Sequence, residues 1–390
     1  GWNRSSLESL QAIVSAGILV DAGSVRMGKG VALGPAVTVP RAIRPPMTET
    51  IMTTRLIGAA LFGLALATPA FADGTVNIYT TREPALIQPL LDSFTADTGI
   101  EAKVVFVKEG LAQRVETEGA NSPADLLSVV DYGNLIELVD RGLTQPVDSA
   151  ALKDAIPANL RDAAGNWFAL SMRARVIYAA KDRVTDETLT YEDLADPRFK
   201  GEVCIRSGQH PYNTSLIAAM IAKDGVDATR SWLEGVKANL ARKAGGGDRD
   251  VARDILANLC DVGIGNSYYV GLMRSGAGGE EQKAWGEAIR VILPTFKDKA
   301  GTHVNISGAA VAKNAPNRDN AVKLLEYLAS EKAQEIYAKA NFEYPVRPGV
   351  AADPIIATLG ELTVDPLPLT DIAKHRVEAS ELVDAVGFDG

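Results

Sequence analysis

Strands and helices alternate in the sequence between residues 75 and 142, and this alternation restricts the possible folds more than any other feature. β-rich segments at residues 75–82, 101–108 and 124–131 are each followed by a segment whose apolar residues have helical spacing, and a glycine follows each helical segment. Such repetition is typical of a parallel sheet covered by helices. We therefore expect an α/β fold for this part of the chain.

Two β-rich segments, residues 166–182 and 303–313, are longer than the strands predicted before them. Each is long enough to cross between two domains. Shorter β-rich and helical segments alternate between them. Two α/β lobes joined by two crossing β segments would leave a cleft, and ligands bind in such clefts and at the carboxyl ends of strands. The expected lobes are residues 73–172 with 306–345, and residues 173–305 with 346–390.

Residues 52–72 have the three parts of a secretory signal peptide. Arg55 supplies positive charge, residues 56–67 form an apolar run, and Ala70 and Ala72 place small side chains at the cleavage site. The apolar run is shorter than the roughly 20 residues that a membrane-spanning helix needs. We therefore expect export to the periplasm and cleavage after Ala72.

Residues 1–51 have no feature that belongs before a signal peptide. They are rich in glycine, proline and valine, and they contain Met27 and Met47 as other possible starts. We interpret them as a non-native upstream extension and exclude them from the fold.

The chain is acidic, with a formal net charge of −9. The first 72 residues hold six basic and three acidic side chains, so the remainder is more acidic than the whole. Proteins that bind nucleic acids usually present a basic face. A nucleic-acid partner is therefore not expected.

The chain has two cysteines, Cys204 and Cys260. An even number of cysteines in an exported protein is compatible with one disulfide, and two cysteines alone make a poor metal site. In an oxidising compartment we expect the disulfide to form; the alternative is a pair of free, buried thiols. Each cysteine precedes a tyrosine, Tyr212 or Tyr268, by eight residues, so a disulfide would hold the two tyrosine segments together.

Three tyrosines follow predicted strand ends. Tyr268 and Tyr269 come after the β-rich segment at residues 261–267, and Tyr212 comes after the segment at residues 202–208 and before a helix. Turn-forming and helix-capping residues surround the pair. We therefore expect both phenols of the pair to converge on one point, near Tyr212.

Three converging phenols suit a hard trivalent cation, because hard cations prefer anionic oxygen ligands. A free phenol has a pKa of about 10, and a bound metal ion favours its deprotonated form. Three phenolates would neutralise ferric iron. A single tyrosine is more often a half-buried side chain with a hydrated hydroxyl, so the prediction depends on the cluster.

Seven segments of the chain, in order, resemble periplasmic ferric-iron-binding proteins, the substrate-binding components of ABC iron importers. They are NSPADLLSVVD, FALSMRARVIYAAKDRV, DPRFKGEVCIRSG, YNTSL, GIGNSYY, GTHVNISG and FEYPVRPGV. The resemblance covers residues 75–350 and implies a two-lobed periplasmic binding protein fold of type II that closes on one Fe³⁺. It implies a monomeric binding protein, not an enzyme, that delivers iron to an inner-membrane permease and ATPase complex.

The resemblance also implies the ligands. The family's adjacent tyrosine pair falls on Tyr268 and Tyr269, and the tyrosine of its YN motif falls on Tyr212. Relatives usually add a histidine or tyrosine from the loop after the first strand, but this loop reads TTREPAL. Its nearest anionic oxygen is Glu83, and the nearest phenol is Tyr79, within the strand.

Arginines beside the expected site have two interpretations. Under the resemblance, Arg173 of the RAR motif, and Arg82, would balance charge or hold an anion such as carbonate. Alternatively, the protein binds a small organic or inorganic anion through Arg82, Arg173 and Arg206. Visible colour distinguishes the two, because ferric phenolate absorbs visible light.

An extracytoplasmic enzyme, such as a hydrolase, is a more distant alternative. The sequence has no Gly-rich phosphate loop, no HExxH and no GxSxG motif. Its three histidines, His210, His303 and His375, are far apart in the sequence. No residue stands out as an activated nucleophile, so we do not expect an enzyme.

Overall fold

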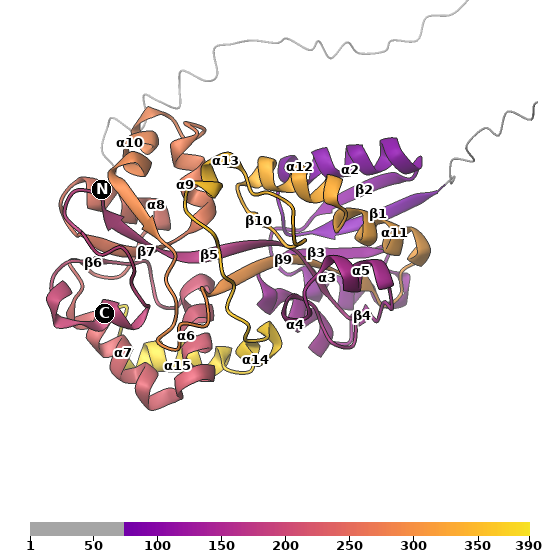
Figure 1. Ribbon diagram of the computed structural model, residues 1–390. Helices are drawn as coiled ribbons and strands as arrows, with labels where there is room; N and C mark the ends of the chain where they lie inside the picture. Colours follow the sequence, from indigo (N-terminus) through magenta and orange to yellow (C-terminus); the bar gives the residue numbers. More distant parts are fainter. Residues whose placement is uncertain (1–73) are drawn as a thin grey trace, which may run out of the picture. The chain divides into compact units, whose positions relative to one another are not determined.

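The computed structural model describes residues 74–390 (Figure 1). The expected signal peptide and upstream extension lie outside these residues. The first elements are β1 (Thr75–Thr80), α2 (Pro84–Thr98), β2 (Glu101–Phe106), α3 (Leu111–Glu118), β3 (Leu126–Val130) and α4 (Tyr132–Asp140). β1 pairs in parallel with both β2 and β3, so the alternation of strands and helices predicted from the sequence is confirmed.

Two long strands, β5 (Phe168–Ala180) and β9 (Val304–Ala312), connect this first group of strands to a second group (Figure 1). The first half of β5 pairs antiparallel with β9, and β9 pairs antiparallel with β3. The second half of β5 pairs with β7 (Val262–Asn266) and β8 (Ile289–Ile292). All residues of β5 and β9 are buried, as expected for strands covered on both faces.

The second group of strands carries most of the middle of the chain. Its remaining elements are β6 (Val203–Cys204), α6 (Pro211–Asp224), α7 (Val226–Ala238), α8 (Asp248–Leu256), α9 (Ser267–Arg274) and α10 (Glu280–Ala288). The prediction of a strand over residues 202–208 was too long. The chain leaves the sheet after Cys204, and the carbonyl of Ile205 accepts from the backbone N–H of Gly245 (3.1 Å) rather than from β7.

Two glycines in β7 allow close packing of this second group. A Cβ atom on Gly263 would lie 2.3 Å from the carbonyl oxygen of Cys204, and one on Gly265 would lie 2.2 Å from the ring of Tyr178. Only a residue without a side chain fits at either position. The two glycines of the segment GIGN therefore leave room for the backbone of β6 beside Gly263 and for the ring of Tyr178 beside Gly265.

The C-terminal third of the chain returns to both groups of strands. α11 (Arg318–Leu328) packs on β1, and α12 (Glu331–Asn341) packs on α2. α15 (Arg376–Val386) packs instead on α6 and α7. This part also contains β10 (Tyr344–Pro345), α13 (Pro354–Ala357) and α14 (Leu369–Ala373). Earlier in the chain, β4 (Thr144–Gln145), α5 (Ala150–Ala155) and four short 3-10 helices complete the described elements.

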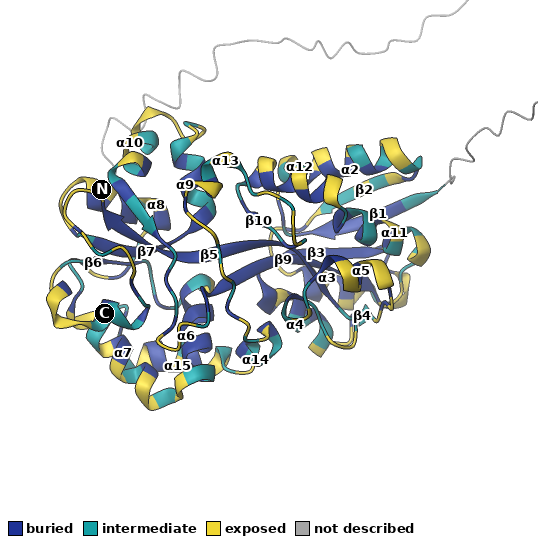
Figure 2. Cartoon of the chain, viewed as in Figure 1, coloured by how far each residue is buried: buried dark blue, intermediate teal, exposed yellow. Residues whose placement is uncertain are grey.

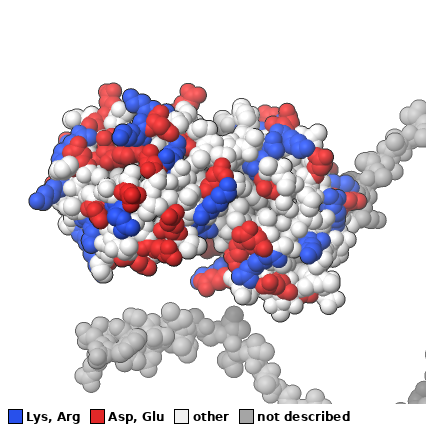
Figure 3. Space-filling view, turned by 90° about the horizontal axis from the view of Figure 1, so that it is seen from below, with Lys and Arg blue, Asp and Glu red and all other residues white. Residues whose placement is uncertain are grey.

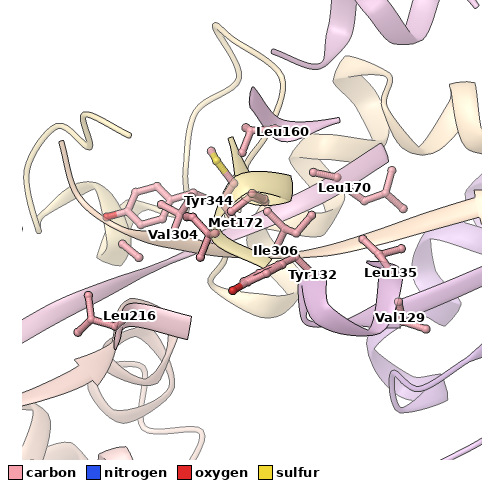
Figure 4. Close-up of a cluster of buried hydrophobic side chains, with 14 of the residues drawn as sticks. Val129, Tyr132, Leu135, Leu160, Leu170, Met172, Leu216, Val304, Ile306 and Tyr344 are labelled. Atoms are coloured by element: carbon pink, nitrogen blue, oxygen red, sulfur yellow. The ribbon is translucent and has the colours of Figure 1, made fainter. Parts of the chain in front are cut away.

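The core follows the sheet, and the exposed residues lie on the outer faces of the helices (Figure 2). Around β5 and β9, Met172, Ile306 and Leu135 belong to one buried cluster (Figure 4). Acidic and basic side chains are interspersed on the face in Figure 3. Among the helices of residues 74–390, none has both the length and the apolar character needed to cross a membrane.

Candidate metal site

Tyr268 and Tyr269 lie in the first turn of α9, directly after β7 ends at Asn266. The hydroxyl of Ser267 accepts from the backbone N–H of Ala174 in β5 (3.1 Å), which fixes the start of the helix against the sheet. The two tyrosine rings are in contact, with centroids 4.1 Å apart, and both are half-buried. The prediction that the pair lies between a strand and a helix is confirmed.

Tyr212 lies in the first turn of α6, after Pro211. His210 precedes the helix: its Nδ1 accepts from the backbone N–H of Tyr212 (3.2 Å), and its ring contacts the tyrosine ring edge-on at 4.5 Å. The Tyr212 and Tyr268 hydroxyl oxygens are 3.4 Å apart. Three phenols from the starts of two helices therefore meet, and helix N-termini favour negative charge.

Burial keeps two of these phenols protonated when no metal is bound. It raises the pKa of Tyr268 well above the usual value, and the phenols of Tyr212 and Tyr269 raise that pKa further, whereas Arg173 lowers it. Burial also raises the pKa of Tyr269, against a hydrogen bond from Tyr268 that lowers it. A cation placed among the oxygens would reverse this preference.

Arg82 and Arg173 form a buried cluster with Glu343. Arg82 Nη2 donates to both carboxylate oxygens of Glu343 (3.0 and 3.1 Å), and Arg173 Nη1 lies 3.5 Å from one of them. Arg173 also donates to the hydroxyl of Ser307 (3.0 Å), which accepts from Arg82 as well. The guanidinium of Arg173 lies 5.7 Å from the ring centre of Tyr212. The cluster therefore borders the tyrosines.

The charges of this cluster do not cancel. Burial alone would raise the pKa of Glu343, but Arg82 and Arg173 outweigh burial and lower it. Burial alone would lower the pKa of Arg173, but Glu343 and the phenols of Tyr212 and Tyr268 outweigh burial and raise it. One carboxylate thus faces two guanidinium groups, which leaves one net positive charge beside the phenols.

Glu343 is absent from the candidate residues of the sequence analysis, although it lies in the segment FEYPVRPGV. Its partners Arg82 and Ser171 are 261 and 172 residues away in the sequence. The only signal was an acidic residue between two aromatic residues, Phe342 and Tyr344. Glu343 becomes buried when β10 pairs with β5.

A second arginine cluster holds the starts of α6 and α9 together. The buried carboxylate of Asp248 accepts from Arg175 (2.6 Å), from Arg206 (3.2 Å) and from the backbone N–H of Asn266 (2.9 Å). Arg175 also donates to the side-chain oxygen of Asn213 (2.6 Å). Arg206, proposed above as an anion partner, is therefore already paired with a carboxylate.

The structure does not bring Tyr79 to the tyrosine cluster. Its hydroxyl donates to Glu118 (3.0 Å) and accepts from Arg114 (3.5 Å), both on α3. Because alternate side chains of a strand point to opposite faces, the position of Tyr79 in β1 directs it to the face that α3 covers. Glu83 is exposed just before α2, and its side chain forms no ion pair or hydrogen bond with the part of the chain that the structure describes.

Cys204 and Cys260 form a disulfide, as predicted. Cys204 ends β6, whereas Cys260 lies two residues before β7 instead of inside it. β6 and β7 pair in parallel, with Val203 opposite Val262. The disulfide therefore connects the two strands that lead to the tyrosines.

Comparisons with known proteins identify the family of this chain. Residues 121–356 match the family described as bacterial extracellular solute-binding protein. Iron uptake protein A2 of Synechocystis is 42% identical over 337 residues, which cover 85% of this chain and 96% of that protein.

Solved structures with the same fold include the Bordetella ferric binding protein. It is 62% identical to this chain, with a TM-score of 0.79 over 81% of this chain and all of that one. The Trichodesmium protein, solved in complex with iron and citrate, is 39% identical, with a TM-score of 0.77 and the same coverage. This chain therefore belongs to the bacterial extracellular solute-binding proteins, a family of binding proteins and not of enzymes, and within it to the periplasmic ferric-iron-binding proteins.

Proposed function

We propose that this protein binds one ferric ion through the phenolates of Tyr212, Tyr268 and Tyr269 and delivers it to an ABC importer. The observation that carries the proposal is the convergence of the three phenols, with two hydroxyl oxygens 3.4 Å apart and two ring centroids 4.1 Å apart. Three phenolates offer hard anionic oxygens and the charge that neutralises Fe³⁺. The Bordetella and Trichodesmium relatives support the choice of iron, because both are described as binding it.

The coordination positions of the iron that the three phenolates leave open would be filled by an anion and by Glu83. The net positive charge of Arg82, Arg173 and Glu343 beside the phenols favours an anion such as carbonate bound next to the metal. Glu83 is exposed and unpaired among the described residues, so its carboxylate is free to approach the metal. Tyr79 is left out of the proposed ligands because Glu118 and Arg114 already engage it.

We propose that the site lies in a cleft between two lobes of the type II fold, residues 73–172 with 306–345 and residues 173–305 with 346–390. A groove of about 630 Å³ between α4 and the start of α6 supports this division. Gly133 of α4, Pro211 of α6 and Arg376 of α15 line the groove, whereas the three tyrosines lie outside its lining. Closure of the lobes would shield the metal from water. The protein would act as a periplasmic monomer that docks on a permease and ATPase complex.

The test is a titration of metal-free protein with ferric citrate, followed by visible absorbance and by metal analysis after desalting. The expected result is a coloured complex, from phenolate-to-iron charge transfer, with one iron per chain. A colourless protein that retains no iron would overturn the proposal.

A small-anion-binding function is the second candidate, and the excess positive charge of the Arg82–Glu343–Arg173 cluster favours it. In that case carbonate or phosphate would stabilise the metal-free protein against heat, and iron would add no further stabilisation.

A further inference from the structure

The last residues of the chain turn back onto the segment that leads to Tyr212. α15 ends at Val386, and the left-handed conformation of the next residue, Gly387 (φ 59°, ψ 42°), reverses the chain. After this turn, the backbone N–H of Phe388 donates to the carbonyl of Val383 (3.0 Å). The ring of Phe388 is thereby buried, and Asp389 is presented to residues 207–209.

The carboxylate of Asp389 holds this segment by three hydrogen bonds. Its Oδ1 accepts from the backbone N–H of Gly208 (2.7 Å). Its Oδ2 accepts from the hydroxyl of Ser207 (2.5 Å) and from the backbone N–H of Gln209 (3.4 Å). Charge-assisted bonds of this kind are stronger than bonds between neutral groups, so Asp389 determines the path of three consecutive residues.

Packing reinforces these bonds. A Cβ atom on Gly208 would lie 2.9 Å from side-chain atoms of both Phe388 and Val383, so the glycine lets the segment lie directly on the tail. The side chain of Gln209 donates to Asp384 (2.8 Å) and accepts from the hydroxyl of Ser380 (2.7 Å), both on α15. The segment is therefore attached to the end of the chain along its whole length.

The other side of the same segment is bonded to the first turn of α6. Asn213 donates from its side-chain amide to the carbonyl of Ser207 (3.1 Å), and the hydroxyl of Thr214 donates to the carbonyl of Gly208 (3.2 Å). Tyr212 lies between Asn213 and the helix-capping His210. A shift of residues 207–209 would consequently move the start of the helix that carries the phenol.

We propose that Asp389 and Phe388 form a clamp, named here the C-terminal clamp, that positions Tyr212 for metal binding. Asp389 is the positioning residue: it touches no metal ligand itself but fixes the segment from which α6 begins. The inference rests on the function proposed above. It follows the general rule that a preorganised site binds more tightly because less motion is lost on binding.

The experiment compares Asp389→Ala, Asp389→Asn and the control Asp162→Ala in the ferric citrate titration. Asp162 is also a half-buried carboxylate that holds a turn, accepting from the backbone and side-chain nitrogens of Asn166 (both 2.9 Å). We expect Asp389→Ala to bind iron roughly tenfold more weakly and to shift the charge-transfer band. Asp389→Asn retains an acceptor oxygen for Gly208 and should recover part of both losses. Asp162→Ala should keep the affinity and the band of the wild type.

A double-mutant cycle separates positioning from a general loss of stability. In the Tyr212→Phe background, Asp389→Ala should have little further effect on iron binding, because the phenolate it positions is already gone. An equal effect in both backgrounds, or wild-type binding by Asp389→Ala, would overturn the clamp. If Asp389→Ala binds iron like the wild type, the Tyr212→Phe variant tests the metal site separately. Loss of the charge-transfer band in Tyr212→Phe would support the metal site without the clamp, whereas an unchanged band would contradict both.

Discussion

The hydroxyl oxygens of Tyr212 and Tyr268 lie 3.4 Å apart although 56 residues separate them in the sequence. The two cysteines of the disulfide are also 56 positions apart, and each precedes its tyrosine by eight positions. β6 ends at Cys204, and the parallel strand β7 begins two residues after Cys260. The chain segments that carry the two tyrosines therefore both start beside the disulfide. The disulfide thus sets the relative position of the two helix starts that carry the phenols.

Replacing Tyr212, Tyr268 or Tyr269 by Phe should weaken iron binding sharply while changing stability little. Each substitution deletes one anionic ligand but keeps the ring that packs beside its neighbours. The measurement is the ferric citrate titration by visible absorbance, with thermal unfolding of the metal-free proteins alongside. Tyr79→Phe serves as the matched control and should bind iron like the wild type. Unchanged binding in all three cleft variants would contradict the proposed site.

Iron binding should release protons, and acidification should weaken it. Burial raises the pKa of Tyr268 and of Tyr269, so both phenols are neutral at pH 7 and must lose a proton to bind the metal. Proton release on adding ferric citrate can be measured in weak buffer with a pH indicator. We expect the wild type to release about one proton more than Tyr268→Phe or Tyr269→Phe. Equal release by all three proteins would show that both phenols stay protonated.

Glu343→Gln should destabilise the protein by about 3–5 kcal/mol, because it leaves two buried guanidinium groups without their carboxylate. Added carbonate should restore part of this loss by binding between Arg82 and Arg173. Thermal unfolding with and without carbonate checks both expectations. The control is Glu118→Gln, which removes a partly exposed carboxylate from Arg114 and should cost about 0–1 kcal/mol. A Glu343→Gln protein as stable as the wild type would contradict the charge assignment.

Removing the disulfide by replacing both cysteines with Ala should lower the free energy of unfolding by about 2–4 kcal/mol, because the closed loop spans a long segment of chain. Urea unfolding of the variant and of the wild type gives the difference. A reductant should destabilise the wild type and leave the variant unchanged. Iron affinity should fall as well, since the two tyrosine segments lose their covalent link.

Stability should decrease as the pH falls below about 6.5 because of His303. Burial, and then Arg175, lower the pKa of His303 to about 3, whereas the unfolded chain takes up the proton near pH 6.5. Neutral His303 therefore contributes stability above pH 6.5, and this contribution is lost progressively as the pH falls toward 3. Between pH 7 and pH 5 the loss is about 2 kcal/mol.

Urea unfolding at the two pH values checks the expectation for His303. His303→Gln should remove the pH dependence that this residue contributes. His375→Gln, at a partly exposed histidine, should keep it. A wild-type pH dependence in His303→Gln would assign the effect to other groups.

The fold was predictable from the sequence wherever the signal is local. The strands and helices from β1 to α4 follow from the spacing of apolar residues and from terminating glycines such as Gly99, which ends α2 in a left-handed conformation. The positions of Tyr268 and Tyr212 at helix starts follow from turn-forming neighbours. β8 and α10 were not predicted, because their polar and apolar residues have no clear period.

The rest of the site depends on contacts between distant parts of the chain. Strand periodicity predicts that alternate residues face opposite sides of the sheet, but it does not predict which side faces the tyrosines. The contacts of Tyr79 with Glu118 and Arg114 of α3 decide this. Glu343 is an ordinary acidic residue until β10 pairs with β5 and brings it to Arg82. Such residues have no signature in one sequence, because their partners lie hundreds of residues away.

The pairing of β3 with β9 has a consequence for the order in which the protein folds. Leu126 lies opposite Val311, so β3 pairs on this side with a strand that is synthesised more than 170 residues later. Pairings of such long range are slow to form. A chain that stops before residue 304 would have an open edge on β3, and open edges promote aggregation. The edge of β3 is therefore covered only after the segment that forms β9 has been made, so this part of the sheet is completed late in synthesis.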